Sequence, residues 1–236
     1  MTTTRKFMTR PQTSLKLRDA CRVKYLISSH VAYNKPLETV LSSMSSIPAV
    51  DKTVVVAGSA TPGTRVVGEV PHHDVRENAY ELTGLIHVSQ NPHLYEGYDY
   101  VLLLHDTIEL GARTTQLVGD HPAFDFDISQ TCDPPRTNMA LYKVQFLVDQ
   151  AEVLSQYDGI SKLEAMNMEI LAHPLSLDKF TDKMTHFNNA SFKRVKQTRK
   201  YSTDERWEAY IASIDVTKWY KKCPDTELQS EFRHRP

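Results

Sequence analysis

Hydrophobic residues in the first half of the chain form short runs, separated by segments in which apolar residues recur at helical spacing. Three runs have the length and the β-branched or aromatic content of strands, and they cover residues 23–28, 52–57 and 100–104. Apolar residues recur at helical intervals over residues 37–44 and again over residues 78–90. Strands that alternate with helices predict an α/β fold with a mixed, mostly parallel sheet flanked by helices.

The third run, YDYVLLLHDT, is apolar on both faces until it ends on His105 and Asp106. Such a pattern is typical of a central strand covered by helices. Ligands of α/β sheets bind at the carboxyl ends of the strands, and an imidazole beside a carboxylate can hold a divalent cation. The rival interpretation is that Asp106 caps the next turn and that His105 is a hydrogen-bonded buried imidazole.

The second half of the chain departs from this alternation. Its pattern predicts a short helix, an extended loop over the sheet edge, a β-capable or mixed segment and a helix, over residues 112–118, 121–136, 139–146 and 146–154. Ser161 and Glu164 form a capping box for a further helix that ends before Pro174. Aromatic residues at helical spacing predict a final helix around residues 207–219, with its aromatic side chains packed against the domain.

Length and composition indicate how the chain is divided into domains. A chain of 236 residues with 40% hydrophobic and 24% charged residues fits one globular domain with an appendage. We expect a flexible N-terminal segment at 1–20, the main α/β domain at 21–176, and a C-terminal helical extension packing on the same domain at 177–236. That extension contains a basic run over residues 193–200, for which a solvated surface is the plainer interpretation.

Charge and cysteine content narrow the function classes. A formal charge of −1 and a pI near 6.8 do not favour nucleic acid or an acidic membrane as partner. Three widely separated cysteines argue against a disulfide scaffold and a structural zinc site. The N-terminus lacks the apolar core of a signal peptide, and no segment reaches the roughly 20 apolar residues of a membrane span. These features predict a soluble, cytoplasmic protein.

Four segments, SSHVAYNKPLETVLSSM, KTVVVAG, ENAYELTGLI and YDYVLLLHDT, together resemble nucleotide-sugar glycosyltransferases of the GT-A type. More narrowly, the chain is similar to glycosyltransferase-like proteins in which the strand ends in His-Asp-Thr in place of Asp-x-Asp. The resemblance covers roughly residues 23–174. It implies a GT-A, Rossmann-like fold and the transfer of a sugar from a nucleotide diphosphate donor to a glycan or another hydroxyl acceptor.

The resemblance also implies where the nucleotide binds. The loop after the first strand would border the base and the ribose, and the start of the helix at residue 78 would approach the ribose or the diphosphate. The residues concerned are Ser28, Ser29, His30, Tyr33, Arg76 and Asn78. Without the resemblance, a polar loop after a strand is unremarkable.

The same resemblance implies a metal that bridges the donor diphosphate. His105 and Asp106 would replace the Asp-x-Asp pair, and His186 would be a late ligand of the metal or the diphosphate. One imidazole in place of a carboxylate favours Mn²⁺ over Mg²⁺, and metal-independent transfer stays open.

For catalysis, an inverting enzyme needs a carboxylate that deprotonates the acceptor hydroxyl. Glu169 is the first candidate for this base, and Asp106 is the second catalytic residue through its effect on the leaving group. Glu164 and the pair Asp125 and Asp127 are the alternatives for the base. The plainer interpretation of Glu169 is a solvent-facing helix residue.

Two other functions stay open. A nucleotidyltransferase would share the sheet, but residues 28–35 lack the glycines of its phosphate loop. A catalytically silent binding module would keep the fold and hold a nucleotide or a partner. His72, His73 and Asp74 suggest a metal site, but a surface turn is the simpler interpretation of these adjacent residues.

Overall fold

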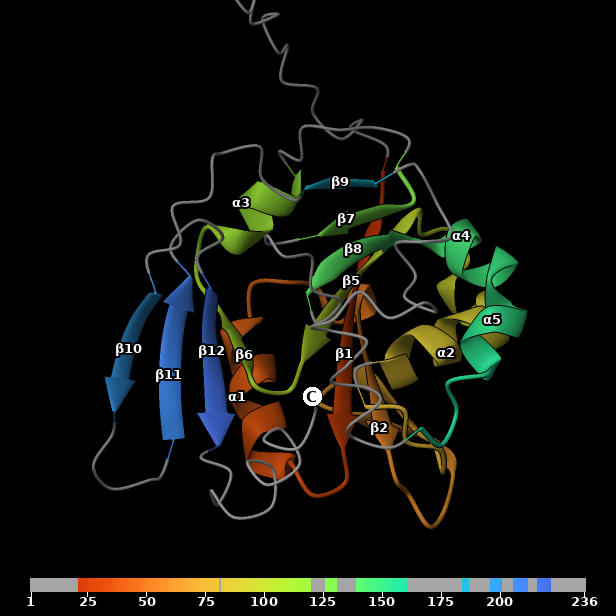
Figure 1. Cartoon of the computed structure of the whole chain (residues 1–236), viewed down its shortest axis with the longest axis horizontal. Helices are drawn as coiled ribbons and strands as arrows, with labels where there is room; N and C mark the ends of the chain where they lie inside the picture. Colours follow the sequence, from red (N-terminus) through yellow and green to blue (C-terminus); the bar gives the residue numbers. More distant parts are fainter. Residues whose placement is uncertain are drawn as a thin grey trace, which may run out of the picture.

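Two sheets and the helices around them make up the structure, a computed structural model (Figure 1). It describes residues 21–80, 82–119, 126–130, 139–160, 184–186, 196–200, 206–211 and 216–221. Within these residues, one sheet has eight strands in the order β3-β4-β2-β1-β5-β8-β7-β9, and the other has four in the order β10-β11-β12-β6. The strands of the first sheet are β1 Val23–His30, β2 Lys52–Ala57, β3 Gly63–Val67, β4 Val70–Asp74, β5 Tyr100–His105, β7 Ile128–Gln130, β8 Ala140–Lys143 and β9 Met184–His186. Those of the second are β6 Ile108–Leu110, β10 Lys196–Lys200, β11 Arg206–Ile211 and β12 Val216–Lys221.

The centre of the large sheet is parallel. Strand β1 pairs in parallel with β2 on one side and with β5 on the other, and β2 pairs in parallel with β4. Because β1 and β5 are neighbours, Ser28 lies opposite His105. The carboxyl ends of four strands therefore meet at one edge of the sheet.

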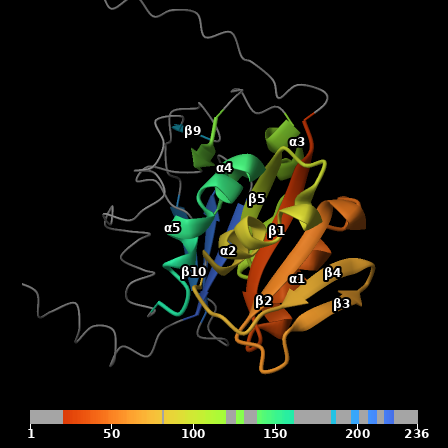
Figure 2. The same cartoon turned by 90° about the vertical axis from the view of Figure 1, so that its right-hand side faces the viewer.

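Helices cover both faces of this sheet (Figure 2). The α-helices are α1 Asn34–Ser43, α2 Leu82–Gln90, α3 Thr114–Gly119, α4 Val144–Asp149 and α5 Ala151–Ser155, and the 3₁₀ turns are η1 Ala49–Asp51 and η2 Pro92–Tyr95. Alternate residues of β1 enter two separate cores: Ile27 packs with α1, and Leu26 packs with α2, α4 and α5. A Cβ on Gly84 of α2 would lie 3.3 Å from the side chains of Leu26 and Leu103, so glycine lets α2 approach the sheet closely.

The fold class predicted from the sequence is confirmed. The second predicted strand coincides with β2, and the predicted helix over residues 78–90 contains α2. The mixed segment at 139–146 contains β8, and the helix expected over 146–154 is divided between α4 and α5. Among the described residues, no helix is both long and apolar enough to cross a membrane.

The prediction of a helical C-terminal extension is wrong for the part that the structure describes. Residues around 207–219 form β11 and β12, and β12 pairs with β6, with Val216 opposite Leu110. Both segments have six residues rich in aromatic and β-branched side chains, a composition that fits a strand, whereas three or four aromatic positions do not define a helical period. The predicted boundaries at residues 20 and 176, and the helix begun by Ser161, lie outside the described residues.

The prediction of a surface turn at His72 and His73 is also wrong. Both residues belong to β4 and are only 2% and 7% exposed. A two-residue turn, Gly68 and Glu69, joins β3 to β4, and both residues have positive φ (54° and 67°), as a tight hairpin requires. Glutamate is unusual at such a position, which is why the sequence did not reveal the hairpin. Strand β7 likewise interrupts the loop expected over 121–136.

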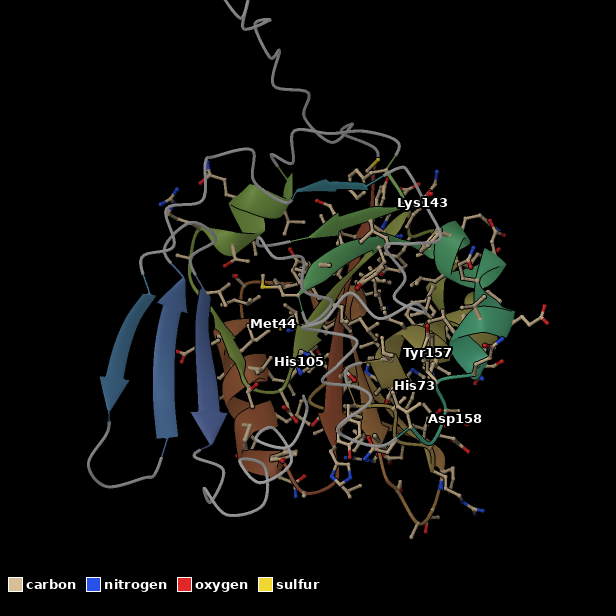
Figure 3. All side chains as sticks on the ribbon, viewed as in Figure 1. Met44, His73, His105, Lys143, Tyr157 and Asp158 are labelled. Carbon is tan, nitrogen blue, oxygen red and sulfur yellow. The ribbon has the colours of Figure 1, made fainter. Side chains whose placement is uncertain are left out.

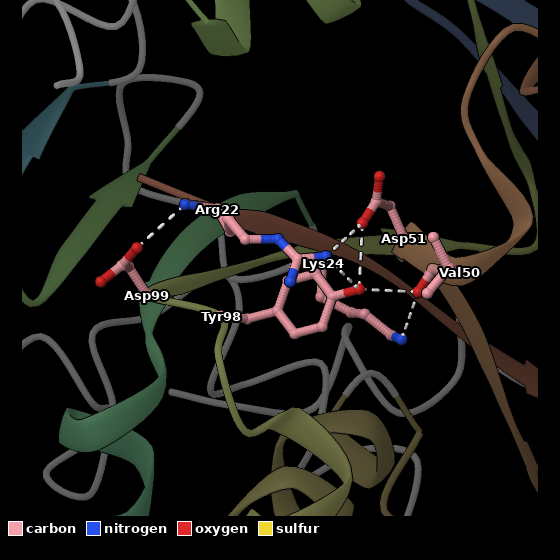
Figure 4. Close-up of polar contacts among 6 residues, drawn as sticks. All are labelled: Arg22, Lys24, Val50, Asp51, Tyr98 and Asp99. Atoms are coloured by element: carbon pink, nitrogen blue, oxygen red, sulfur yellow. Dashed lines mark hydrogen bonds and ion pairs between the residues drawn. The ribbon is translucent and has the colours of Figure 1, made fainter. Parts of the chain in front are cut away.

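A cluster of polar contacts joins the start of β1 to η1 and to the turn before β5 (Figure 4). The Tyr98 hydroxyl donates to the Val50 carbonyl (2.7 Å) and lies 2.9 Å from Oδ1 of Asp51. The Arg22 guanidinium and the Lys24 ammonium lie 4.3 and 4.7 Å from the centre of the Tyr98 ring. Tyr98 thus contributes both through its hydroxyl and through its ring.

We predict that Tyr98→Phe lowers the free energy of unfolding by about 1 kcal/mol, because the hydroxyl is lost while the cation–π contacts remain. Tyr98→Ala should cost about 2–4 kcal/mol, because the ring is lost as well. Urea unfolding measures both values. Tyr33→Phe, at a side chain that is 42% exposed, is the control and should leave stability unchanged. Equal losses for the two Tyr98 variants would contradict the role given to the ring.

Burial lowers the pKa of three histidines on β4 and α2. Burial lowers the pKa of His72, whose ring nitrogens have no hydrogen-bond partner among the described residues. Burial also lowers the pKa of His73, and it lowers the pKa of His87 to about 4, with a further contribution from neighbouring histidines. The ring of His87 lies 4.7 Å from that of His73, and its Nδ1 lies 3.0 Å from the Tyr95 hydroxyl.

These lowered pKa values predict a loss of stability in acid. Above about pH 6.5 the imidazoles are neutral in both states; below it, the unfolded chain binds protons that the folded chain does not. His87 alone should lower the free energy of unfolding by about 2 kcal/mol between pH 6.5 and pH 5. His87→Gln should remove most of this slope, whereas His93→Gln, at an exposed position, should keep most of it, because burial is the largest cause of the lowered pKa of His87. An unchanged slope in His87→Gln, measured by urea unfolding at several pH values, would refute this explanation.

Candidate functional site

A pocket of about 400 Å³ opens at the carboxyl ends of β1 and β5. The connection after β1 leads to α1 on one face of the sheet, and the connection after β4 leads to α2 on the other, so the pocket lies between them, where α/β sheets bind ligands. Its lining contains seven of the residues predicted from the sequence, together with three others: Ser28, Ser29, His30, Tyr33, Asn78, His105 and Asp106, and Ala32, Tyr80 and Thr107.

Asp106 is the carboxylate of this pocket, and it is held across the sheet by β1. It is 7% exposed, and its Oδ2 accepts a hydrogen bond from Ser29 Oγ at 2.9 Å. The backbone N–H of Asp106 donates to the Ser28 carbonyl at 3.3 Å, which continues the pairing of β1 with β5 by one residue. The buried serine therefore fixes the orientation of the carboxylate.

His105 is the last residue of β5 (Figure 3). Asp106 already lies in the following turn. Strict alternation of side chains ends there, and both residues line the same pocket. Among the described residues, no group of three or more His, Cys, Asp or Glu side chains could hold a metal ion. A cation at this position would have His105 and Asp106 as its protein ligands, with ligand oxygens and water completing the coordination.

His30 closes the pocket on the β1 side. Its Nδ1 accepts a hydrogen bond from the Ala32 N–H at 3.2 Å, which assigns the ring proton to Nε2 in the neutral imidazole. The Tyr33 ring meets the His30 ring edge-on, with 6.0 Å between ring centres. At the end of β2, Gly58 has φ +76°, and a Cβ there would lie 2.6 Å from His30 Nε2. Glycine is therefore required for the imidazole to occupy its place.

The turn that enters α2 forms the opposite wall. Asn78 Oδ1 accepts from the N–H of Tyr80 at 3.0 Å, as in an Asx turn, and Ser28 Oγ donates to the Tyr80 carbonyl at 3.2 Å. Tyr80 has φ +53°, a left-handed conformation that costs a residue with a side chain about 1–3 kcal/mol. Sequence reasoning missed Tyr80; the asparagine two residues before it is the signal that points to the turn.

Other predicted residues are not brought to this pocket. Arg76 is exposed in the same connection but is not part of the lining. His186 ends β9, which β8 and β7 separate from β5, so its backbone lies about 14 Å from β5 at ordinary strand spacing. The structure thus does not bring His186 to His105 and Asp106. Asp127 precedes β7 and is not part of the lining either. Glu169, Glu164 and Asp125 lie outside the described residues.

A larger cavity of about 790 Å³ lies at the amino ends of β1 and β5, where its lining includes Tyr98, Asp99 and Lys143. Figure 3 shows Lys143 at the end of the sheet away from His105. Asp99 accepts a hydrogen bond from the Arg22 N–H, within the cluster that stabilises the fold. Size alone does not make this cavity the functional site, because ligands of parallel sheets bind at the opposite edge.

No protein-family model matches the chain, and no curated protein matches it. Solved structures that it is similar to include the glycosyltransferase GlyE of Streptococcus pneumoniae TIGR4 in its apo form (10% identity, TM-score 0.43, 70% of this chain and 44% of that chain) and in a second structure (12%, 0.43, 71% and 45%). A third is the bifunctional glycosyltransferase WbbM in its apo form (13%, 0.41, 74% and 40%). The chain spans less than half the length of these proteins. Likeness at this level does not bear on function, which depends on the pocket itself.

We predict that Gly58→Ala lowers the free energy of unfolding by about 1–3 kcal/mol, because it combines backbone strain with a clash against His30. Gly63→Ala is the matched control, because a Cβ on Gly63 meets no atom within 4 Å and its φ is not left-handed. Chemical unfolding of the two variants measures the difference. Gly58→Ala with the stability of Gly63→Ala would show that His30 does not occupy the position described.

Proposed function

We propose that the chain is a glycosyltransferase that binds a nucleoside diphosphate sugar in the 400 Å³ pocket and transfers the sugar to a hydroxyl acceptor. The observation that carries the proposal is the buried Asp106 carboxylate, oriented by Ser29 at the carboxyl ends of the two central parallel strands. The volume of the pocket suits a small polar ligand of nucleotide size.

The charges of the lining support a donor that carries its own cation. No lysine or arginine is among the described residues that line the pocket, although a diphosphate is strongly negative. A carboxylate and an imidazole, from Asp106 and His105, are suitable ligands for a divalent ion, and the nitrogen donor favours Mn²⁺ over Mg²⁺. When bound, such an ion would neutralise the negative charge that develops on the leaving diphosphate.

The remaining groups of the pocket are suited to orient the donor. The Oδ1 of Asn78 accepts a hydrogen bond within the turn. Its Nδ2 is therefore the atom suited to donate a hydrogen bond to a ligand. Ser29 keeps the Asp106 carboxylate in one orientation, which reduces the ordering needed when the donor binds. His30 is held at the pocket wall by the hydrogen bond that its Nδ1 accepts from the Ala32 N–H.

In the transfer step, the acceptor oxygen forms a bond to the anomeric carbon while the bond from that carbon to the phosphate oxygen breaks. The acceptor proton passes to a base, and the electron pair of the broken bond leaves with the nucleoside diphosphate. Glu169 remains the sequence-based candidate for this base. Whether sugar transfer inverts or retains configuration depends on where that carboxylate lies.

A binding module without turnover is the second candidate. Among the described lining residues Asp106 is the single carboxylate, and it already accepts a hydrogen bond from Ser29. A chain with this pocket and no base would bind the donor and leave it intact. The nucleotidyltransferase alternative finds no support, because the turn after β1 has no glycines between residues 28 and 35.

Thermal unfolding against a panel of nucleoside diphosphates and nucleotide sugars, with and without Mn²⁺, tests the proposal. At a hundredfold excess over Kd, a ligand of the folded state should raise Tm by about 5–10 °C. Asp106→Asn should lose the Mn²⁺-dependent part of this shift, since it keeps the shape of the side chain and removes its charge. Asp149→Asn, an exposed carboxylate on α4, should retain the full shift.

The same panel separates the two candidates. Release of nucleoside diphosphate from one nucleotide sugar over hours, with product formed on an acceptor, supports the glycosyltransferase. Tight binding with the donor intact supports the binding module. No shift with any nucleotide would overturn both.

A further inference from the structure

Tyr80 holds a backbone conformation that its side chain disfavours, at the wall of the pocket. Among the described residues, only Tyr80 (φ +53°) and Glu69 (φ +67°) combine a side chain with a positive φ. Glu69 lies in the two-residue turn between β3 and β4, where the hairpin geometry demands this conformation. No hairpin constrains Tyr80, which precedes α2.

Two pocket residues hold this conformation in place. The Tyr80 N–H donates to Asn78 Oδ1 at 3.0 Å, and the Tyr80 carbonyl accepts from Ser28 Oγ at 3.2 Å. The second bond reaches across from β1, 52 residues away in the sequence. Glycine would adopt the same backbone without strain and would make the same two bonds, since both use main-chain atoms of residue 80. The presence of tyrosine therefore calls for a role of the side chain.

The side chain is available for such a role. Tyr80 is half-buried and lines the pocket, and its hydroxyl makes no hydrogen bond to a described residue. Tyr33, 42% exposed, lines the same pocket from the connection that leads to α1 on the other face of the sheet. Two tyrosines therefore line the pocket, one from the connection to α1 and one from the connection to α2, and aromatic rings of this kind suit a flat ligand ring.

We propose that Tyr80 is a binding residue that, with Tyr33, flanks the base of the nucleotide, and that its left-handed backbone serves to present the ring. This inference rests on the proposed function and adds to it the residue that recognises the nucleoside. Strain that the fold sustains at a pocket wall is typical of preorganised sites. Asn78 links the two roles, because its Oδ1 holds the turn while its Nδ2 can donate to the nucleoside.

Calorimetric titration of the full chain tests the contact between Tyr80 and the base. The ligands are the four common nucleoside diphosphates and inorganic pyrophosphate, all with Mn²⁺. For the nucleotide that wild type prefers, Tyr80→Gly should weaken binding at least tenfold and leave pyrophosphate binding within twofold. Tyr80→Phe should retain most of the affinity, because the ring remains. Glu69→Gly relieves the same kind of strain away from the pocket and should change neither affinity.

Thermal unfolding of the same variants tests whether the backbone of Tyr80 is strained. Tyr80→Gly and Glu69→Gly should have Tm values equal to or above that of wild type, because glycine removes the strain. A large fall in Tm for Tyr80→Gly would show that the ring is a packing element and would overturn the inference.

The outcomes also separate this inference from the function on which it rests. Unchanged nucleotide affinity in Tyr80→Gly overturns the role of Tyr80 alone. Equal losses of affinity for nucleotide and for pyrophosphate would show that the substitution disturbs the whole pocket, and they overturn the contact with the base. Absence of nucleotide binding in wild type overturns the proposed function and this inference together.

Discussion

The parallel pairing of β1 with β5 is the constraint on which the site depends. Its register sets Ser28 opposite His105, and one residue further the Ser29 hydroxyl meets the Asp106 carboxylate at 2.9 Å. A hydrogen bond to a charged group contributes about 1.5–3 kcal/mol, so the pairing that builds the sheet also orients the carboxylate. A shift of the register by one residue would exchange the faces of every side chain on the strand and would separate the pair.

Two walls of the pocket depend on residues with a left-handed backbone, Gly58 and Tyr80. Gly58 leaves room for His30 on one side, and the Asn78 turn holds Tyr80 in a left-handed conformation on the other. The strands and helices are stabilised by two ordinary apolar cores that meet at the sheet. The fold therefore sustains local strain at the pocket without losing its framework, which is the usual relation between a scaffold and its site.

Elements with a periodic apolar pattern could be predicted from the sequence. Features that depend on pairing between distant segments of the chain could not. The three apolar runs, the last at residues 100–104, and the helical spacing between them were sufficient to predict the parallel core and the position of His105 and Asp106 at its edge. Burial of His72 and His73 could not be predicted, because it results from the hairpin between β3 and β4, whose turn contains Glu69 in place of a typical turn residue. The strands β11 and β12 were taken for a helix because short aromatic segments fit both periods until a pairing partner decides.

The measurement that tests the central claim most directly is the location of Mn²⁺ and a nucleoside diphosphate in crystals of their complex, with the ion identified by its anomalous scattering. The account predicts Mn²⁺ bound to the Asp106 carboxylate, with the diphosphate beside it in the pocket at the ends of β1 and β5. A nucleotide seated in the cavity between Tyr98 and Lys143, or an ion with no contact to Asp106, would contradict it.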